Sequence, residues 1–212
     1  NGLAIAADWI PAIEIQGEGL LLQFDEAAVR AWEDRPAVKE RSHKLRRAHD
    51  AALRSNPGAG KFLGVRYYML HSLSHLLITA ISLECGYSAS AIRERIYCSA
   101  SRTEAQPMAA ILLSTGTSGS EGTLGGLVDQ GRRIIEHLRR AFDLGRLCSN
   151  DPICASHDPE DDAVERYHEG AACHGCLFIA EPSCERYNRY LDRALVVPCL
   201  DHPELAFLRE RP

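Results

Sequence analysis

The sequence predicts an α+β fold that is mainly helical, with a small sheet and one structural zinc site. Three observations predict it: long segments have the composition or period of helices, short apolar runs have the length of strands, and five of the eight cysteines lie between residues 148 and 184. The 212 residues are 45% hydrophobic and 25% charged. This composition is typical of a globular chain and excludes wholesale disorder.

Charge and hydropathy exclude two further classes of protein. The net charge of −5 argues against a surface that binds nucleic acid everywhere, although it permits a local basic patch. No run approaches the roughly 18 uninterrupted apolar residues of a membrane helix, and no secretory signal opens the sequence. We therefore expect a cytoplasmic protein with no membrane partner. The sequence begins with Asn1, and we expect it to be a piece of a longer protein.

The first sixty residues predict strands followed by a charged helical segment. Two apolar runs within residues 9–24 flank Gly17-Glu18-Gly19, a pattern that favours a hairpin. Residues 26–55 are polar and helix-prone, with basic residues bunched between Lys39 and Arg47. The glycines and proline of 56–60 then predict a boundary. We divide the chain into 1–60, expected to be the end of a larger region, and 61–212.

The second part alternates predicted helices and strands. Apolar residues crowd every face of 65–84, which predicts a buried helix that ends at Gly86. Ser88 or Ser90 is expected to cap another helix through Tyr97. The apolar run 108–114 predicts a central strand, 127–147 has helical period, and a last helix is expected over about 184–197. The glycine-rich loop 115–126 lacks the lysine pattern of a phosphate-binding loop.

The cysteine spacing predicts a structural zinc site. Cys173-x2-Cys176 lets two thiolates bend back onto one ion, and the turn at Asp151-Pro152 brings Cys148 and Cys154 together in a similar way. Zinc takes four such ligands tetrahedrally and leaves no open position, so the site is expected to be structural. Cys184 is a fifth candidate, either as a substitute ligand or as a core thiol at the start of the last helix.

His71 and His75 lie one helical turn apart, a spacing that suits a metal. Ser72 stands where a metallopeptidase has its general-base glutamate, so peptidase chemistry has no support. We favour two hydrogen-bonded core histidines. The alternatives are a polar face that contacts DNA or a partner chain, and a metal-dependent enzyme in which a nearby acid such as Glu84 completes the site.

Two basic clusters are candidates for a DNA-backbone contact. One is the run between Lys39 and Arg47. In the other, arginines seven positions apart share a helix face, Arg132 with Arg139 and Arg133 with Arg140. This second cluster consists of Arg132, Arg133, Arg139 and Arg140.

An ordered set of motifs resembles a known family. The set comprises His71-Ser-Leu-Ser-His75, Glu94-Arg-Ile-Tyr97, Gly122-Thr-Leu-Gly-Gly-Leu127, Cys148-Ser-Asn-Asp-Pro-Ile-Cys154, Ala172-Cys-His-Gly-Cys-Leu177 and Glu181-Pro-Ser-Cys-Glu185. Together they resemble the cysteine-rich zinc-binding domain of MrfA-type DNA-repair helicases, and more closely the DrmB-like proteins of DISARM anti-phage defence. The resemblance implies one zinc held by Cys148, Cys154, Cys173 and Cys176, with Cys184 not essential.

The same resemblance implies a non-catalytic module that associates with a superfamily-2 helicase and helps to bind DNA. The chain has neither a phosphate-binding loop nor an Asp-Glu-x-His box, so any ATPase activity is expected in a partner or in a missing region. We expect a zinc-binding component of a DNA-defence system rather than an enzyme. A metal-dependent enzyme that uses His71 and His75, and a pure protein-interaction scaffold, are the two alternatives.

Overall fold

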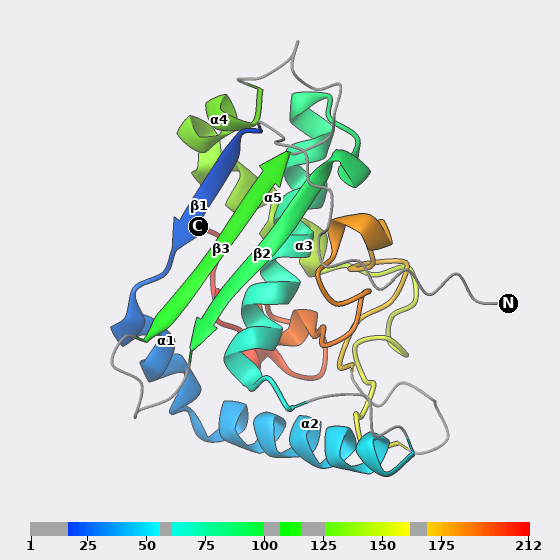
Figure 1. Cartoon of the computed structure of the whole chain (residues 1–212). Helices are drawn as coiled ribbons and strands as arrows, with labels where there is room; N and C mark the ends of the chain where they lie inside the picture. Colours follow the sequence, from blue (N-terminus) through cyan, green and yellow to red (C-terminus); the bar gives the residue numbers. More distant parts are fainter. Residues whose placement is uncertain (1–16, 56–60, 100–106, 116–125, 162–168) are drawn as a thin grey trace, which may run out of the picture.

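A computed structural model describes residues 17–55, 61–99, 107–115, 126–161 and 169–212. Within them, a three-stranded antiparallel sheet lies against a layer of helices, and irregular chain lies beside α3, above α2 in the view of Figure 1. The predicted α+β class, mainly helical with a small sheet, is therefore confirmed.

The sheet has the order β1-β3-β2, with strands β1 (Gly19–Gln23), β2 (Ile92–Ser99) and β3 (Met108–Thr115). Leu21 pairs with Leu112, and Ile96 pairs with Ile111 on the other side of β3. The apolar run after Pro107 is the central strand, as predicted. The other half of the hairpin expected within 9–24 falls mostly outside the described residues; β1 itself pairs with β3.

The prediction of a helix through Tyr97 is wrong. Ser88 caps only a single 3-10 turn, Ala89–Ala91, and the chain then enters β2. The burial of β2 explains this outcome, since Ile92, Glu94 and Ile96 are buried while the arginines between them are exposed. That period of two belongs to a strand with one face on the core.

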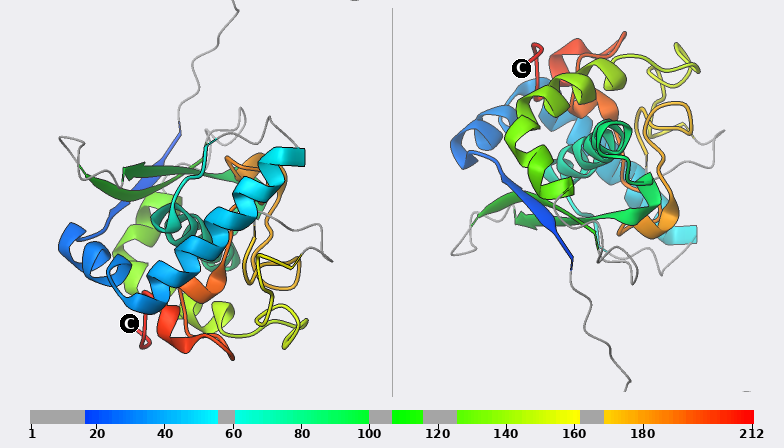
Figure 2. Two further views of the ribbon diagram at one scale, coloured as in Figure 1. Left: turned by 90° about the horizontal axis from the view of Figure 1, so that it is seen from below. Right: turned by 90° about the horizontal axis from the view of Figure 1, so that it is seen from above.

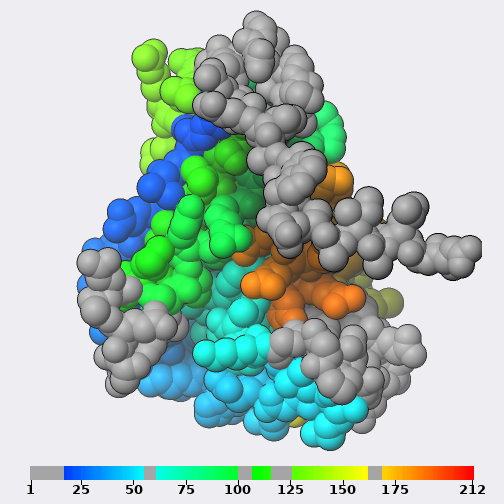
Figure 3. Space-filling view, in the orientation of Figure 1, coloured from blue at the N-terminus to red at the C-terminus, as the bar shows by residue number. Residues whose placement is uncertain are grey.

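The helical prediction for 26–55 is confirmed as two helices, α1 (Glu26–Glu33) and α2 (Pro36–Ser55). Asp25 begins α1 by accepting a 2.7 Å hydrogen bond from the Ala28 amide, and Pro36 suits the first turn of α2. Both views of Figure 2 show the helices on one side of the sheet. Figure 3 shows strands at the surface on the other side, where Leu21 is 61% exposed.

The central element is α3 (Val65–Cys85), which is buried over most of its length, as predicted, and ends at Gly86 in the left-handed conformation. The helical period of 127–147 gives α4 (Gly126–Gln130), a 3-10 turn, and α5 (Ile134–Gly145). One hydrophobic core unites α1, α2, α3 and the C-terminal segment. Its parts come from both sides of residue 60.

The helix expected over 184–197 is also wrong. Within residues 184–197 a single 3-10 turn forms, Arg193–Leu195, and another, Glu181–Ser183, comes just before them. Tyr187, Asn188 and Tyr190 have φ of 54°, 58° and 64°, which a right-handed helix cannot use. The Asn188 side chain accepts from the Ile179 amide at 3.1 Å and so fixes an irregular path.

Candidate metal centres

Two turns bring four cysteines together, as the spacing predicts. Cys148 and Cys154 follow α5, and their sulfurs meet those of Cys173 and Cys176, with all four within 4.8 Å of one another. The Sγ–Sγ distances include 3.4 Å for Cys148–Cys173, 3.8 Å for Cys154–Cys176 and 3.7 Å for Cys173–Cys176. A tetrahedron of thiolates about 2.3 Å from zinc has edges of about 3.8 Å. The four sulfurs therefore fit zinc.

Backbone amides support the sulfurs in the same way in both turns. The Asn150 amide donates to Cys148 Sγ at 3.4 Å, and the Gly175 amide donates to Cys173 Sγ at 3.3 Å. In each case the donor lies two residues after the cysteine. Such outer hydrogen bonds stabilise thiolates and hold them in the orientation that a metal requires.

The four thiols cannot all ionise side by side without a cation. Burial and the neighbouring thiols raise the pKa of Cys148 to about 11. The hydrogen bond with Cys154, together with burial, raises the pKa of Cys176 far above its usual value. The same hydrogen bond lowers the pKa of Cys154 to about 6. A divalent ion removes the repulsion that separates these pKa values.

Arg193 supplies a buried positive charge behind this site. Its side chain is fully buried, donates to the Gly145 carbonyl at 2.9 Å and forms an ion pair with Asp151, which lies between the first two cysteines. The guanidinium also contributes to the lowered pKa of Cys154. Because zinc with four thiolates carries excess negative charge, this arginine offsets part of it.

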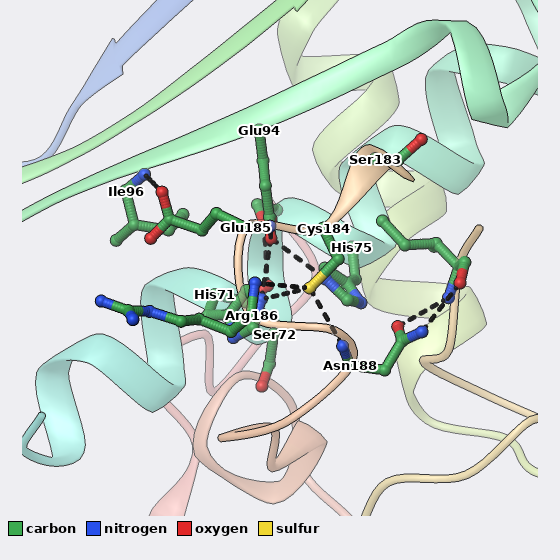
Figure 4. Close-up of polar contacts among 12 residues, drawn as sticks. His71, Ser72, His75, Glu94, Ile96, Ser183, Cys184, Glu185, Arg186 and Asn188 are labelled. Atoms are coloured by element: carbon green, nitrogen blue, oxygen red, sulfur yellow. Dashed lines mark hydrogen bonds and ion pairs between the residues drawn. The ribbon is translucent and has the colours of Figure 1, made fainter. Parts of the chain in front are cut away.

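Cys184 does not join these four sulfurs. It lies in a second group with His71, His75 and Glu94, whose donor atoms are also within 4.8 Å of one another (Figure 4). His71 Nε2 is 2.7 Å from Glu94 Oε1 and 3.2 Å from Cys184 Sγ. His75 Nε2 is 3.3 Å from the same Glu94 oxygen. All four side chains are buried.

Burial places the two histidines in the core. Both are 0% exposed, and each has an Nδ1 paired with a backbone carbonyl, Tyr190 for His71 and Leu177 for His75. A direct contact of these rings with DNA or a partner, one of the alternatives above, does not fit this burial. Each ring is hydrogen-bonded inside the core through its Nδ1, and both Nε2 atoms face the Glu94 carboxylate.

The acid beside the histidines is Glu94, not Glu84. Glu84 lies at the surface, where it pairs with Arg133 and Arg140. Glu94 was missed because its segment was predicted to be a helix. As a strand, it places a glutamate between two inward-facing isoleucines, and that position of a charge on an apolar face was the available signal.

The two basic clusters are largely neutralised by acids. In α2 the cations form ion pairs, and Arg46 lies 4.7 Å from the centre of the Phe62 ring. Arg133 pairs with Glu136 and Glu84, whereas Arg132 is 87% exposed with one distant partner. The pairs of α2 are Lys39–Asp34, Arg41–Asp192, Lys44–Asp158 and Arg47–Glu160.

A surface groove adjoins the second cysteine turn. Its lining includes the cations of Arg139, Arg140 and Arg211, together with His174 and Cys176. Two acids, Glu136 and Asp143, also line it. The groove thus places part of the predicted arginine cluster next to the four sulfurs.

Comparisons with known proteins agree with the cysteine geometry. Residues 73–177 match the family model of the MrfA Zn-binding domain, a range that holds all four clustered cysteines and ends just after Cys176. Over 208 residues the chain is 39% identical to a DISARM protein DrmB of Bacillus paralicheniformis. The match covers 95% of this chain and 35% of that relative, so the chain spans about a third of its length.

The predicted cofactor, a structural zinc, is confirmed by the family match and the four-sulfur geometry together. Among the described residues, no helix is both long and apolar enough to cross a membrane.

Proposed function

This chain is DrmB-like and carries an MrfA Zn-binding domain, and from this premise we propose that it is a non-catalytic zinc-binding component of a DISARM-like anti-phage system. In this proposal it works in the cytoplasm, associates with a superfamily-2 helicase and helps to bind DNA. The zinc ligands are Cys148, Cys154, Cys173 and Cys176, and the metal stabilises the fold without taking part in a reaction.

The groove beside the cysteine turns is the observation that carries the DNA-binding part. Arg139 and Arg140 project from α5 into it, and Arg211 joins them from the C-terminal segment. Asp143 pairs with Arg211 and Glu84 pairs with Arg140, yet three arginines against two acids leave the groove lining net positive. On a chain of net charge −5, such a surface favours phosphate contact. The zinc turn would fix one wall of that groove.

DNA binding is tested by fluorescence anisotropy of labelled duplex and single-stranded DNA, over a range of salt concentrations. Each phosphate contact contributes about 0.9 to the slope of log affinity against log salt. We expect Arg139→Ala with Arg140→Ala, both in the groove lining, to weaken binding and to lower that slope by roughly 1–2. Arg54→Ala with Arg93→Ala removes the same charge from exposed positions away from the groove and is the matched control. Equal losses in both variants would contradict a role for the groove.

Association with a helicase is a separate step. The outer face of the sheet exposes Leu21 and Met108, at 61% and 40%, and an exposed apolar surface of this kind favours protein docking. We expect Leu21→Lys to reduce co-purification with a co-expressed superfamily-2 helicase. Leu83→Lys alters a leucine near the end of α3 that is 66% exposed, close to the exposure of Leu21, and is the control. No co-purification of the unaltered chain would contradict the association, and DNA binding without it would leave a free-standing module.

A further inference from the structure

We propose that His71, His75, Glu94 and Cys184 hold a second divalent metal ion, separate from the four-cysteine site and of the zinc class. Their two Nε2 atoms, one carboxylate oxygen and Sγ all lie within 4.8 Å of one another. They come from α3, β2 and the segment after the second cysteine turn, and their tips converge in Figure 4. His71 and Cys184 both lie outside the matched range 73–177, so the family match does not imply this site.

The orientation of the imidazoles is the first argument. His75 Nδ1 is 2.8 Å from the Leu177 carbonyl, and His71 Nδ1 is 3.3 Å from the Tyr190 carbonyl. A carbonyl only accepts, so each Nδ1 must carry the proton and donate it. In the neutral ring this leaves Nε2 with a free lone pair, and both Nε2 atoms point at the same centre. Metal-binding histidines are held in this way by their outer hydrogen bonds.

The backbone around Cys184 is the second argument. The Arg186 amide, two residues later, donates to Cys184 Sγ at 3.3 Å, and the Asn188 amide donates at 3.1 Å. The first of these bonds repeats the pattern of Cys148 with Asn150 and of Cys173 with Gly175. Three cysteines of this chain therefore have the same amide-to-sulfur turn, and two of them belong to the zinc site. The turn at Cys184 is built to stabilise a thiolate.

Charge balance is the third argument. A carboxylate and a thiolate with two neutral imidazoles carry two negative charges in a buried place, and one divalent cation neutralises them. The Glu94 carboxylate is held in position by the Ser74 hydroxyl and by the Glu185 amide, which donates at 3.2 Å. Two nitrogens, one sulfur and one oxygen suit zinc, and four buried protein ligands make a closed structural site.

The competing arrangement is a proton in place of the metal. Burial opposes the charged form of His71, but Glu94 outweighs burial and raises the pKa of His71 to about 10. A protonated His71 would then form a buried ion pair with Glu94. Burial also opposes the charged form of His75, but hydrogen bonds with Cys184 and Glu94 raise its pKa, and the two histidines lower the pKa of Cys184 to about 7 against burial. A second ion pair, between His75 and the Cys184 thiolate, therefore belongs to the metal-free arrangement. The two arrangements differ in the metal content of the chain.

The experiment counts metal ions in the complete chain. The purified chain is stripped with a chelator under reducing conditions, refolded with excess zinc, desalted and measured by plasma mass spectrometry. We expect two zinc ions per chain in the wild type and one in Cys184→Ala and in His71→Gln. Cys85→Ser removes a thiol at the end of α3 outside both groups and should keep two. One zinc ion per folded wild-type chain would overturn the proposal.

A cobalt titration of the wild type keeps the test decisive if the variants do not fold. Two equivalents of cobalt are expected to saturate the chain, and one equivalent would contradict the second site. Where Cys184→Ala folds, as judged by circular dichroism, one of five thiolate ligands is lost. The thiolate-to-cobalt charge-transfer absorbance should then fall by about a fifth, because that absorbance follows the number of coordinated thiolates. No change in absorbance would show that Cys184 is not a ligand.

Discussion

At the scale of single residues, the zinc site depends on cysteines far from one another in sequence and on small residues around them. Cys148 and Cys173 are 25 positions apart, yet their sulfurs are 3.4 Å apart. Glycine also matters at one entry to the second turn, since a Cβ on Gly170 would collide with the buried carboxylate of Asp192. The chain around the metal therefore tolerates little added volume.

Replacing one ligand tests the metal assignment. Cys173→Ala should lose the zinc ion of the four-cysteine site and lower the unfolding temperature, because structural zinc stabilises only the folded chain. Cys199→Ala, a buried thiol outside the group, keeps the metal and serves as the control. Metal content by plasma mass spectrometry and thermal unfolding by circular dichroism give the result. Retention of that zinc in a folded Cys173→Ala chain would contradict the assignment.

Replacing a glycine tests the packing around the turn. Asp192 accepts hydrogen bonds from Arg41 at 2.8 Å and from the Ala171 amide at 3.0 Å, so its carboxylate cannot move aside freely. We expect Gly170→Ala to lower the free energy of unfolding by about 1–3 kcal/mol through overpacking. In Gly175→Ala the nearest atom is the Ser149 hydroxyl, the end of an exposed side chain, and a smaller loss is expected. Urea denaturation compares the two.

At the scale of elements, a buried ion-pair group fastens α1 to α3. The Arg66 side chain is 1% exposed and forms bidentate hydrogen bonds with Glu26 and Glu33 at 2.7–3.0 Å. It also donates to the Ser99 carbonyl at the end of β2. Protonation or removal of Glu26 leaves the buried charge of Arg66 with Glu33 as its remaining acidic partner, so the contact between α1 and α3 is sensitive to pH.

This group predicts a pH-dependent stability. Burial opposes ionisation of Glu26, but its hydrogen bonds with Arg66 outweigh burial and hold its pKa below the ordinary value. Its contribution is therefore present above about pH 5 and is lost as the pH falls through the carboxyl pKa. We expect Glu26→Gln to destabilise the chain at pH 7 and to differ less from the wild type near pH 4. Urea denaturation at both pH values tests this, and a gap that widens in acid would contradict it.

At the scale of the whole molecule, the C-terminal segment closes the core against the first helix. Trp32 is fully buried and its Nε1 donates to the Leu205 carbonyl at 2.7 Å, a contact between residues 173 positions apart. Phe207 packs edge-on against the same indole, with ring centres 5.9 Å apart. The two ends of the described chain are thus parts of one core.

Truncation of Leu205 tests how much the packing of the C-terminal segment on the core contributes to stability. Leu205 is 3% exposed, and Leu205→Ala should lower the free energy of unfolding by about 2–4 kcal/mol because it leaves a cavity. In a Trp9→Phe background Trp32 is the one remaining tryptophan. Adding Leu205→Ala to that background should shift the fluorescence of Trp32 to longer wavelength, because water then reaches the indole. Leu200→Ala changes a leucine that is 66% exposed and should leave both readouts unchanged. An unchanged stability of Leu205→Ala would contradict the packing described.

The sequence by itself determined the features that depend on local spacing and period. The uniformly apolar segment 65–84 predicted α3, the run after Pro107 predicted the central strand, and the paired cysteines predicted structural zinc. These could be predicted because each is encoded within a few turns of chain. A helix period, a strand length or a Cys-x2-Cys turn needs no knowledge of distant residues.

The tertiary structure alone decided which distant residues meet. Residues 92–99 form the strand β2 because their apolar face packs against α3, and this packing outweighed the helix that Ser88 or Ser90 was expected to cap. The tertiary structure also took Cys184 away from the other thiols and placed it with His71, 113 positions earlier, and with Glu94. No local pattern carries such a contact, because packing of the core, and not the period of the chain, brings these side chains together.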